Sequence, residues 1–163
     1  MKEVSDFTAA KSHCQSLIDG LRELQGAGLA ANQIGLDLNI FVAEVRKTEL
    51  FPDREESPLL VMLNSEIIQR SPETDSLYEG CFSVPGLVGL VPRSTWVEVR
   101  YQTTAGEERI ERIDGYLARV IQHEVDHLEG RFYLDRMETM LTLSTRDNYM
   151  QYVLAPQKEA RDK

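Results

Sequence analysis

Residues 122–127 read Gln-His-Glu-Val-Asp-His, an H-E-x-x-H pattern within a segment of helical periodicity. Side chains four residues apart lie on one face of a helix, about one turn apart, so His123 and His127 can bind one metal ion. Glu124 would then lie beside that ion, and the pattern supplies two ligands and a base. The alternative interpretation is two surface histidines on a charged helix face.

A catalytic metal of this kind needs a third protein ligand and one open position for water. A metzincin would place a third histidine where this chain has Tyr133, so a zincin endopeptidase lacks its ligand here. The remaining histidine, His13, is predicted to be a surface residue. Cys81 follows Gly80 in a predicted compact turn over residues 79–83, and a thiolate is a strong metal ligand. Taken alone, however, Cys81 is more typical of a small buried hydrophobic residue.

Residues 26–33 read GAGLAANQ, a segment of small residues that ends in Gln33. Glycines and alanines let a backbone run close to a ligand. A glutamine amide can donate a hydrogen bond to a developing oxyanion without titrating. A tight β-turn with a buried glutamine would explain the same residues.

Together, GAGLAANQ, EGCFS (residues 79–83) and QHEVDH resemble the three signature motifs of the peptide deformylases, in the order of that family. The resemblance spans about residues 8–137, and three motifs together are far more specific than any one of them. It implies a metal-dependent hydrolase that removes the formyl group from N-formylmethionyl peptides of nascent proteins and releases formate.

The resemblance also implies a role for each motif residue. The implied metal ligands are Cys81, His123 and His127. A metal held there lowers the pKa of its bound water toward about 7. Glu124 would take a proton from the attacking water and pass it to the departing amine. The side-chain amide of Gln33 and the backbone N–H of Phe82 would meet the oxyanion.

Cofactor and substrate follow from the same resemblance. The resting metal of the family is usually Fe²⁺, with Zn²⁺, Ni²⁺ or Co²⁺ as substitutes, and a thiolate ligand makes the iron form sensitive to oxidation. The substrate would be an extended strand that pairs with backbone around Ala27, Gly28 and Gly80, a form of β-augmentation.

Selectivity for methionine would come from an apolar pocket. Tyr116 and Val120 share a helix face with the two motif histidines and are the candidates for its walls, although plain core packing explains them equally well. Relatives often have an arginine seven residues after the metal cysteine, where this chain has Val88. That difference keeps open a specialised or inactive relative that acts on another formylated amine or only binds.

Length and charge limit the function classes. The chain has 163 residues, which suits one domain, and its 18 Lys and Arg against 27 Asp and Glu give a net charge of −9. An acidic surface repels phosphate backbones and anionic lipid, so neither nucleic acid nor membrane is an expected partner. No apolar run approaches the roughly 20 residues that cross a bilayer, and no signal-peptide core is present. With only two cysteines, we expect a cytoplasmic protein, or an organellar one if a transit peptide has been removed.

Hydrophobic periodicity and turn residues predict the order of the elements. They predict helices over about 7–25, 114–128 and from 138 toward 156, strands near 40–42, 66–70, 95–101 and 108–113, and a surface loop at 46–58. This order indicates an α+β fold with antiparallel sheets packed around the central H-E-x-x-H helix, and with an N-terminal and a C-terminal helix. We expect a single catalytic domain over residues 1–163.

Residues 136–163 carry five basic and four acidic residues, a net charge of +1. A solvated helix face is a better interpretation of so small a surplus than docking to the ribosome.

Overall fold

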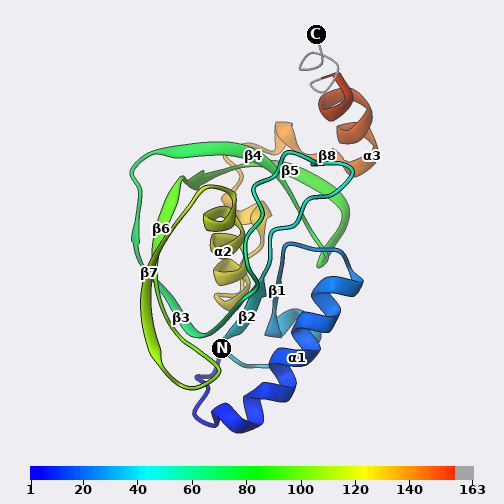
Figure 1. The fold of residues 1–163 in the computed structure, drawn as a ribbon. Helices are drawn as coiled ribbons and strands as arrows, with labels where there is room; N and C mark the ends of the chain where they lie inside the picture. The colour runs from blue at the N-terminus through cyan, green and yellow to red at the C-terminus, as the bar shows by residue number, and fades with distance from the viewer. Residues whose placement is uncertain (157–163) are drawn as a thin grey trace. The chain divides into compact units, whose positions relative to one another are not determined.

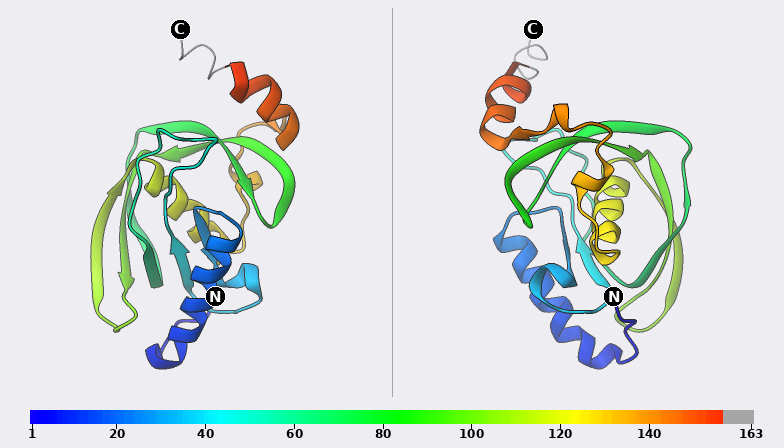
Figure 2. Two further views of the ribbon diagram at one scale, coloured as in Figure 1. Left: turned by 45° about the vertical axis from the view of Figure 1, so that its right-hand side comes forward. Right: turned by 180° about the vertical axis from the view of Figure 1, so that it is seen from behind.

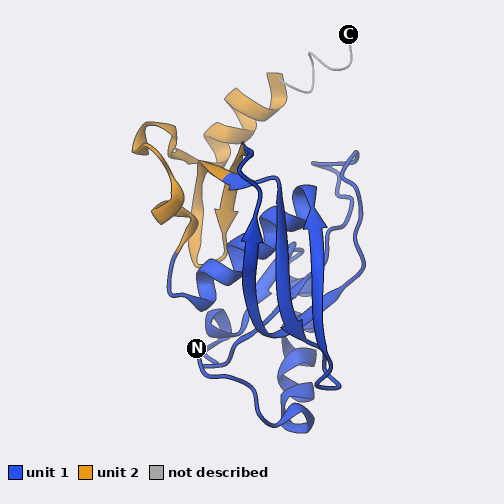
Figure 3. Ribbon diagram, turned by 90° about the vertical axis from the view of Figure 1, so that its left-hand side faces the viewer, with its two compact units in different colours: residues 1–74, 93–131 blue, residues 75–92, 132–163 orange. Residues whose placement is uncertain are grey.

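The chain forms two compact units in the computed structural model, which describes residues 1–156. The first unit comprises residues 1–74 and 93–131, and the second comprises residues 75–92 and the chain from residue 132 onward (Figure 3). Helices occur together with antiparallel strands, which confirms the predicted α+β class. The single catalytic domain over residues 1–163 stays a prediction.

The first unit holds a five-stranded antiparallel sheet in the order β1-β2-β3-β6-β7 (Figure 1). Its strands are β1 (Gly28–Ala30), β2 (Ile40–Ala43), β3 (Leu60–Arg70), β6 (Trp96–Gln102) and β7 (Glu108–Asp114). Its helices are α1 (Phe7–Glu23), the short 3₁₀ helix η1 (Ala31–Ile34) and α2 (Gly115–Leu128).

Strand β2 is buried along its whole length and divides the interior of the first unit into two cores. Successive side chains of a strand point to opposite faces of the sheet. Phe41 and Ala43 accordingly pack with residues of α2, whereas Ile40 and Val42 pack with residues of α1. The two helices therefore cover opposite faces of β1 and β2 (Figure 2).

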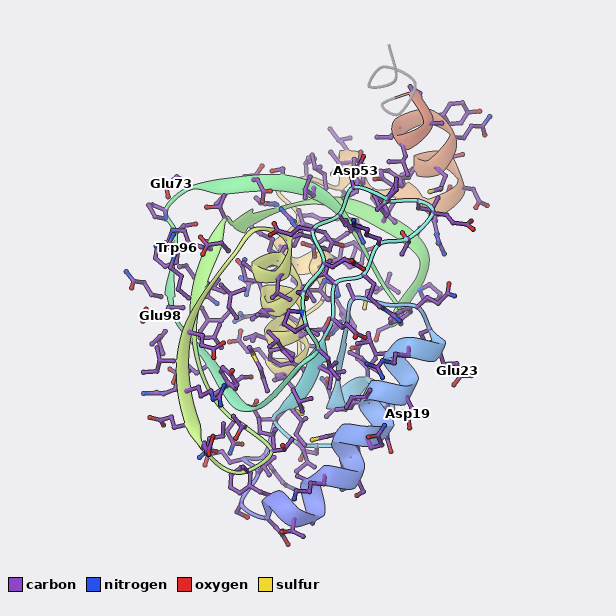
Figure 4. The ribbon with its side chains drawn as sticks, viewed as in Figure 1. Asp19, Glu23, Asp53, Glu73, Trp96 and Glu98 are labelled. Carbon is purple, nitrogen blue, oxygen red and sulfur yellow. The ribbon has the colours of Figure 1, made fainter. Side chains whose placement is uncertain are left out.

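Strand β6 shows the same alternation with only one face buried. Val97 and Val99 belong to the core beneath α2, while Trp96 and Glu98 lie on the opposite, outer face (Figure 4). The Arg112 guanidinium lies 4.2 Å from the centre of the Trp96 ring, a cation–π contact on that outer face. This end of the sheet thus presents a charged surface opposite the helix.

Both long helices of the first unit lie where the sequence predicts them, and their ends have identifiable causes. Asp6 caps α1, since its carboxylate accepts hydrogen bonds from the backbone N–H groups of Thr8 and Ala9 at 3.0 and 2.9 Å. The helix ends through Gln25, whose φ of 55° is left-handed, and the Gly26 N–H bonds back to the helix at 3.0 Å.

Helix α2 begins after Asp114 and ends before Gly130, as predicted. Asp114 occupies the N-cap position, but its side chain does not cap the helix. The Asp114 carboxylate instead accepts hydrogen bonds from Arg112 at 3.0 and 3.3 Å. The predicted bounds are therefore right, although Asp114 does not act as the usual aspartate N-cap because a neighbouring guanidinium competes for its carboxylate.

The second unit contains a three-stranded sheet in the order β4-β5-β8. Its elements are β4 (Thr74–Cys81), β5 (Val84–Ser94), η2 (Tyr133–Arg136), η3 (Met140–Thr142), β8 (Ser144–Thr145), α3 (Arg146–Asn148) and the π-helical η4 (Tyr149–Leu154). The sequence did not predict β4 and β5. The compact turn expected at residues 79–83 is confined to Phe82 and Ser83, because the preceding three residues end β4.

The C-terminal helix begins later than predicted. Helical backbone starts at Arg146 rather than 138, because a short 3₁₀ turn and the strand β8 precede it. Thr145 caps the helix, since its Oγ1 accepts a hydrogen bond from the Asn148 N–H at 3.2 Å. Lys158, Arg161 and Lys163, on which the ribosome-docking interpretation depends, lie outside the described residues. Over residues 1–156, no helix is both long and apolar enough to span a membrane.

Candidate functional site

Helix α2 brings the two motif histidines together. The rings of His123 and His127 stand edge to face, with centroids 4.9 Å apart and planes at 80°. Each offers a ring nitrogen, and these two nitrogens lie within 4.8 Å of each other. Imidazole nitrogens bind zinc-like ions at about 2.0–2.1 Å, so one ion can be shared by this pair after small side-chain adjustments. His127 is buried and His123 half-buried, as suits ligands at the floor of a site.

Glu124 is buried against strand β1. A Cβ atom added to Gly28 would lie only 2.7 Å from Cδ of Glu124, so only glycine lets the strand approach this carboxylate so closely. The Glu124 side chain thus contacts β1 at Gly28, and it follows His123 directly on α2. This position suits a base that acts on a small group lying beside the strand.

Strand β1 is the edge strand of the five-stranded sheet. The carbonyl of Ala27 accepts a hydrogen bond from the Glu44 N–H at 2.9 Å, on the side of β2. Main-chain groups of successive strand residues point in opposite directions, so the N–H and C=O of Gly28 point away from β2. The residue that touches Glu124 therefore also directs its backbone polar groups toward the sheet edge.

The GAGLAANQ segment is held in place by its own side chains. Gln33 accepts a hydrogen bond through Oε1 from the Ala30 N–H at 2.9 Å. The NH₂ group at the other end of the amide is a donor and does not take part in this contact. Asn32 donates through Nδ2 to the carbonyl of His127 at 2.5 Å and so ties η1 to α2. The sequence analysis did not select Asn32, and its place inside the motif was the only signal.

A buried polar clamp fixes the other side of α2. Gln122 accepts from the Ser94 N–H at 3.2 Å and donates to the Ser94 carbonyl at 2.9 Å. One turn later, Asp126 accepts from Arg93 at 2.5 Å, and these two side chains are only 3% and 4% exposed. Since Gln122 and Asp126 each precede a motif histidine by one residue, the clamp sets the rotation of the histidines about the helix axis. No local pattern in the sequence links Arg93 and Ser94 to this helix.

Breaking the clamp should cost far more stability than breaking an exposed ion pair. We expect Asp126→Asn to lower the free energy of unfolding by about 3 kcal/mol, since removing one partner of a buried ion pair is strongly destabilising. The matched control is Glu66→Gln, which breaks the exposed Glu66–Arg100 pair and should cost less than about 1 kcal/mol. Urea unfolding of both variants measures the difference, and equal losses would contradict the structural role of the clamp.

In the second unit, Cys81 is a half-buried residue at the end of β4. Its Sγ accepts a hydrogen bond from the Ser83 N–H at 3.3 Å, a contact that favours a thiolate. Gly80 lets β4 approach β5 closely, because a Cβ there would lie 3.2 Å from Val88. Val88 itself is buried within β5. Phe82, whose backbone N–H is a predicted oxyanion donor, follows in the turn with an exposed side chain.

Tyr133 stands where the metzincin pattern has its third histidine, but its surroundings are not those of a metal ligand. It is a buried core residue of the second unit. Burial raises the pKa of the Tyr133 phenol, and the neighbouring negative charges of Cys81 and Glu79 raise it further. A tyrosine in these surroundings stays protonated at neutral pH and is a poor metal ligand.

Tyr116 and Val120 have different surroundings although they share a helix face. Val120 is buried in the core cluster of the first unit. Tyr116 is half-buried, and the Arg54 guanidinium lies over its ring at 4.1 Å and over the Phe51 ring at 3.9 Å. Phe51 and Arg54 belong to the predicted surface loop at 46–58, so this loop rests on the first turn of α2.

Comparison with known proteins gives one consistent result. The family model described as polypeptide deformylase matches residues 1–142. The chain is 35% identical to peptide deformylase 2 of Nostoc sp., over 85% of this chain and 80% of that protein. It is 38% identical to peptide deformylase 2 of Pseudomonas putida, over 83% of this chain and 78% of that protein.

Solved structures agree with these relatives. The Met-Ala-Ser-bound class I type b peptide deformylase of Acinetobacter baumannii superposes with a TM-score of 0.78 at 33% identity, over 83% of this chain and 84% of that one. The peptide deformylase of Thermotoga maritima gives 0.74 at 34% identity, over 85% and 88%. These matches confirm the family and the fold that the three motifs predict, and this chain therefore belongs to the peptide deformylase family, metal-dependent hydrolases that remove the N-formyl group from nascent peptides.

Proposed function

We propose that this chain deformylates N-formylmethionyl peptides with Glu124 as the base and with the two histidines of α2 as metal ligands. The observation that most strongly supports this function is the close approach of Gly28 to the buried Glu124 carboxylate, on the helix that carries the paired imidazoles. This arrangement places the proposed base directly against an edge strand to which a peptide can pair. The proposal includes a single catalytic domain and a cytoplasmic place of action, where nascent chains are made.

The proposed metal ligands are Cys81, His123 and His127. The histidine nitrogens are close enough to share an ion, and the Sγ of Cys81 accepts a backbone hydrogen bond that favours its thiolate form. Two imidazoles and one thiolate suit Fe²⁺, which we place first, and also Zn²⁺, Ni²⁺ or Co²⁺. When bound, such an ion acts as a Lewis acid and lowers the pKa of water toward about 7.

The chain's own residues move the protons and hold the developing charge. Glu124 takes a proton from the water that attacks the formyl carbon and returns it to the departing amine. The C–N bond breaks, and formate and a free peptide N-terminus result. Gln33 is the proposed side-chain donor to the oxyanion, because the opposite end of its amide is already bonded to Ala30. The backbone N–H of Phe82 is the second proposed donor.

The peptide part of the substrate is proposed to bind as an extended strand. Gly28 directs its backbone groups to the edge of the sheet. Ala27 and Gly80 are further proposed backbone partners of the substrate. Tyr116 and Val120 are the proposed walls for the methionine side chain. Val120 lies in the core cluster and so would form the base of that pocket, while Tyr116 is the more accessible of the two.

The acyl group is the sharpest test of this function. We expect the protein to release formate from formyl-Met-Ala-Ser. Release of acetate from acetyl-Met-Ala-Ser should have a kcat/KM lower by about 10- to 200-fold, because one extra methyl must fit beside Gly28 and Glu124. Chromatography of the products should find intact Met-Ala-Ser. Internal cleavage of unformylated Met-Ala-Ser would instead indicate an endopeptidase, and binding without any formate would indicate a protein that has lost turnover.

A further inference from the structure

Arg46 lies beside the backbone that leads into the site. It follows β2 by three residues, and its Nη2 donates a hydrogen bond to the Gly26 carbonyl at 3.3 Å. Gly26 precedes Gly28 by two residues, which is about 7 Å along an extended chain. The guanidinium is therefore held within one or two residues of the strand segment that touches Glu124.

The charge of Arg46 is only partly balanced. Its Nε lies 3.8 Å from Oε2 of Glu44, and that carboxylate accepts two hydrogen bonds from Arg22, both at 3.2 Å. The hydrogen bond from Arg22 also holds the pKa of Glu44 below its ordinary value, so Glu44 stays ionised. Two guanidinium groups thus face one carboxylate, which leaves one positive charge in excess.

Arg46 also keeps hydrogen-bonding capacity. A guanidinium has five N–H donors, and within residues 1–156 Arg46 uses one of them, in the hydrogen bond to the Gly26 carbonyl. Its side chain is 35% exposed. It can therefore accept a further anionic partner without giving up the contact that positions it.

The proposed function fixes the direction in which a peptide must run. The formyl group is the end of the substrate, and it lies beside Glu124 and Gly28. The segment after Gly28 is closed by η1, where Gln33 bonds to Ala30. The rest of the peptide must then run the other way, past Ala27 toward Gly26. Three extended residues cover about 10 Å, which brings the third residue to the reach of Arg46.

We propose that Arg46 is a specificity residue that binds a carboxylate carried by the third residue of the substrate. This inference rests on the proposed function. The carboxylate can belong to an Asp or Glu side chain or to the free C-terminus of a tripeptide. Arg46 acts on binding rather than on chemistry, because three extended residues, about 10 Å of chain, separate the carboxylate that it binds from the formyl group.

The test compares four substrates that differ only at the third residue. They are formyl-Met-Ala-Ser with a free C-terminus, the same peptide as its C-terminal amide, and the amides of formyl-Met-Ala-Asp and formyl-Met-Ala-Asn. We expect the parent protein to favour each carboxylate-bearing member of a pair by about threefold to fivefold, through KM with kcat unchanged. A preference in only one pair identifies the source of the carboxylate.

Arg46→Gln should abolish the preference, and Arg46→Lys should retain part of it. The matched control is Lys47→Gln, which removes one positive charge from the next, exposed residue and should leave the preference intact. A parent without a preference in either pair, or an Arg46→Gln variant that keeps it, would overturn the inference while leaving the proposed function standing. Absence of formate from all four peptides would overturn the proposed function and this inference with it.

Discussion

Glu124→Ala is expected to retain bound metal and to lose formate release by about 10²- to 10⁴-fold, the usual contribution of a positioned acid–base group. The loss should fall on kcat, because the proton is transferred in the transition state and the carboxylate is not a proposed metal ligand. Glu124→Gln keeps the shape of the buried side chain and should lose activity to a similar degree. Metal content and formate release, both measured on the same samples, give the comparison.

The control for this prediction is Glu129→Gln. Glu129 lies at the C-terminal end of the same helix and pairs with Arg131 on the surface. It should keep full activity, which separates loss of the base from a general effect of charge on α2. Near-normal turnover by Glu124→Gln would show that another group takes the proton and would refute the assigned base.

Cys81→Ser is expected to lose both metal and activity. A hydroxyl replaces the thiolate, and it is a far weaker ligand for a divalent transition metal at neutral pH. Mutation of a residue that only hydrogen-bonds to a metal ligand typically lowers metal affinity by about 10- to 100-fold. Loss of a ligand itself should lower the metal affinity by at least that much. Metal titration of the stripped protein measures the affinity, and formate release measures the activity.

Cys14→Ala is the matched control because it removes the other cysteine of the chain. Cys14 is buried among the apolar residues of α1, and burial raises the pKa of its thiol. This variant should lose a little stability and none of its metal affinity. If Cys81→Ser instead binds metal as tightly as the parent protein, the proposed ligand set is wrong.

The elements of the first unit were predictable because their signals are local. Leu17 and Leu21 lie one turn apart on α1, and this helical spacing correctly predicted a helix buried on one face. The apolar run at Ile40 and Phe41 likewise predicted β2. The sequence missed β5 because residues 85–89 include Pro85, Gly86 and Gly89, which are signals for turns rather than strands.

The motif residues of the site were predictable, and their supports were not. The spacing of His123, Glu124 and His127 is itself helical, so their common placement follows from the sequence. The partners of the clamp, Arg93 and Ser94, lie about 30 positions away from α2, and no local pattern joins them to it. The contact of Arg46 with Gly26 is equally non-local. Such contacts depend on how the strands pair, which local periodicity does not report.

Metal-dependent formate release by the unaltered chain tests the central claim most directly. The measurement uses anaerobically purified protein and formyl-Met-Ala-Ser, with metal content determined before chelation, after chelation, and after reloading with iron or nickel. We predict that formate release follows metal occupancy, disappears in the stripped protein and returns on reloading. Protein that holds stoichiometric iron or nickel and releases no formate in either form would contradict the account.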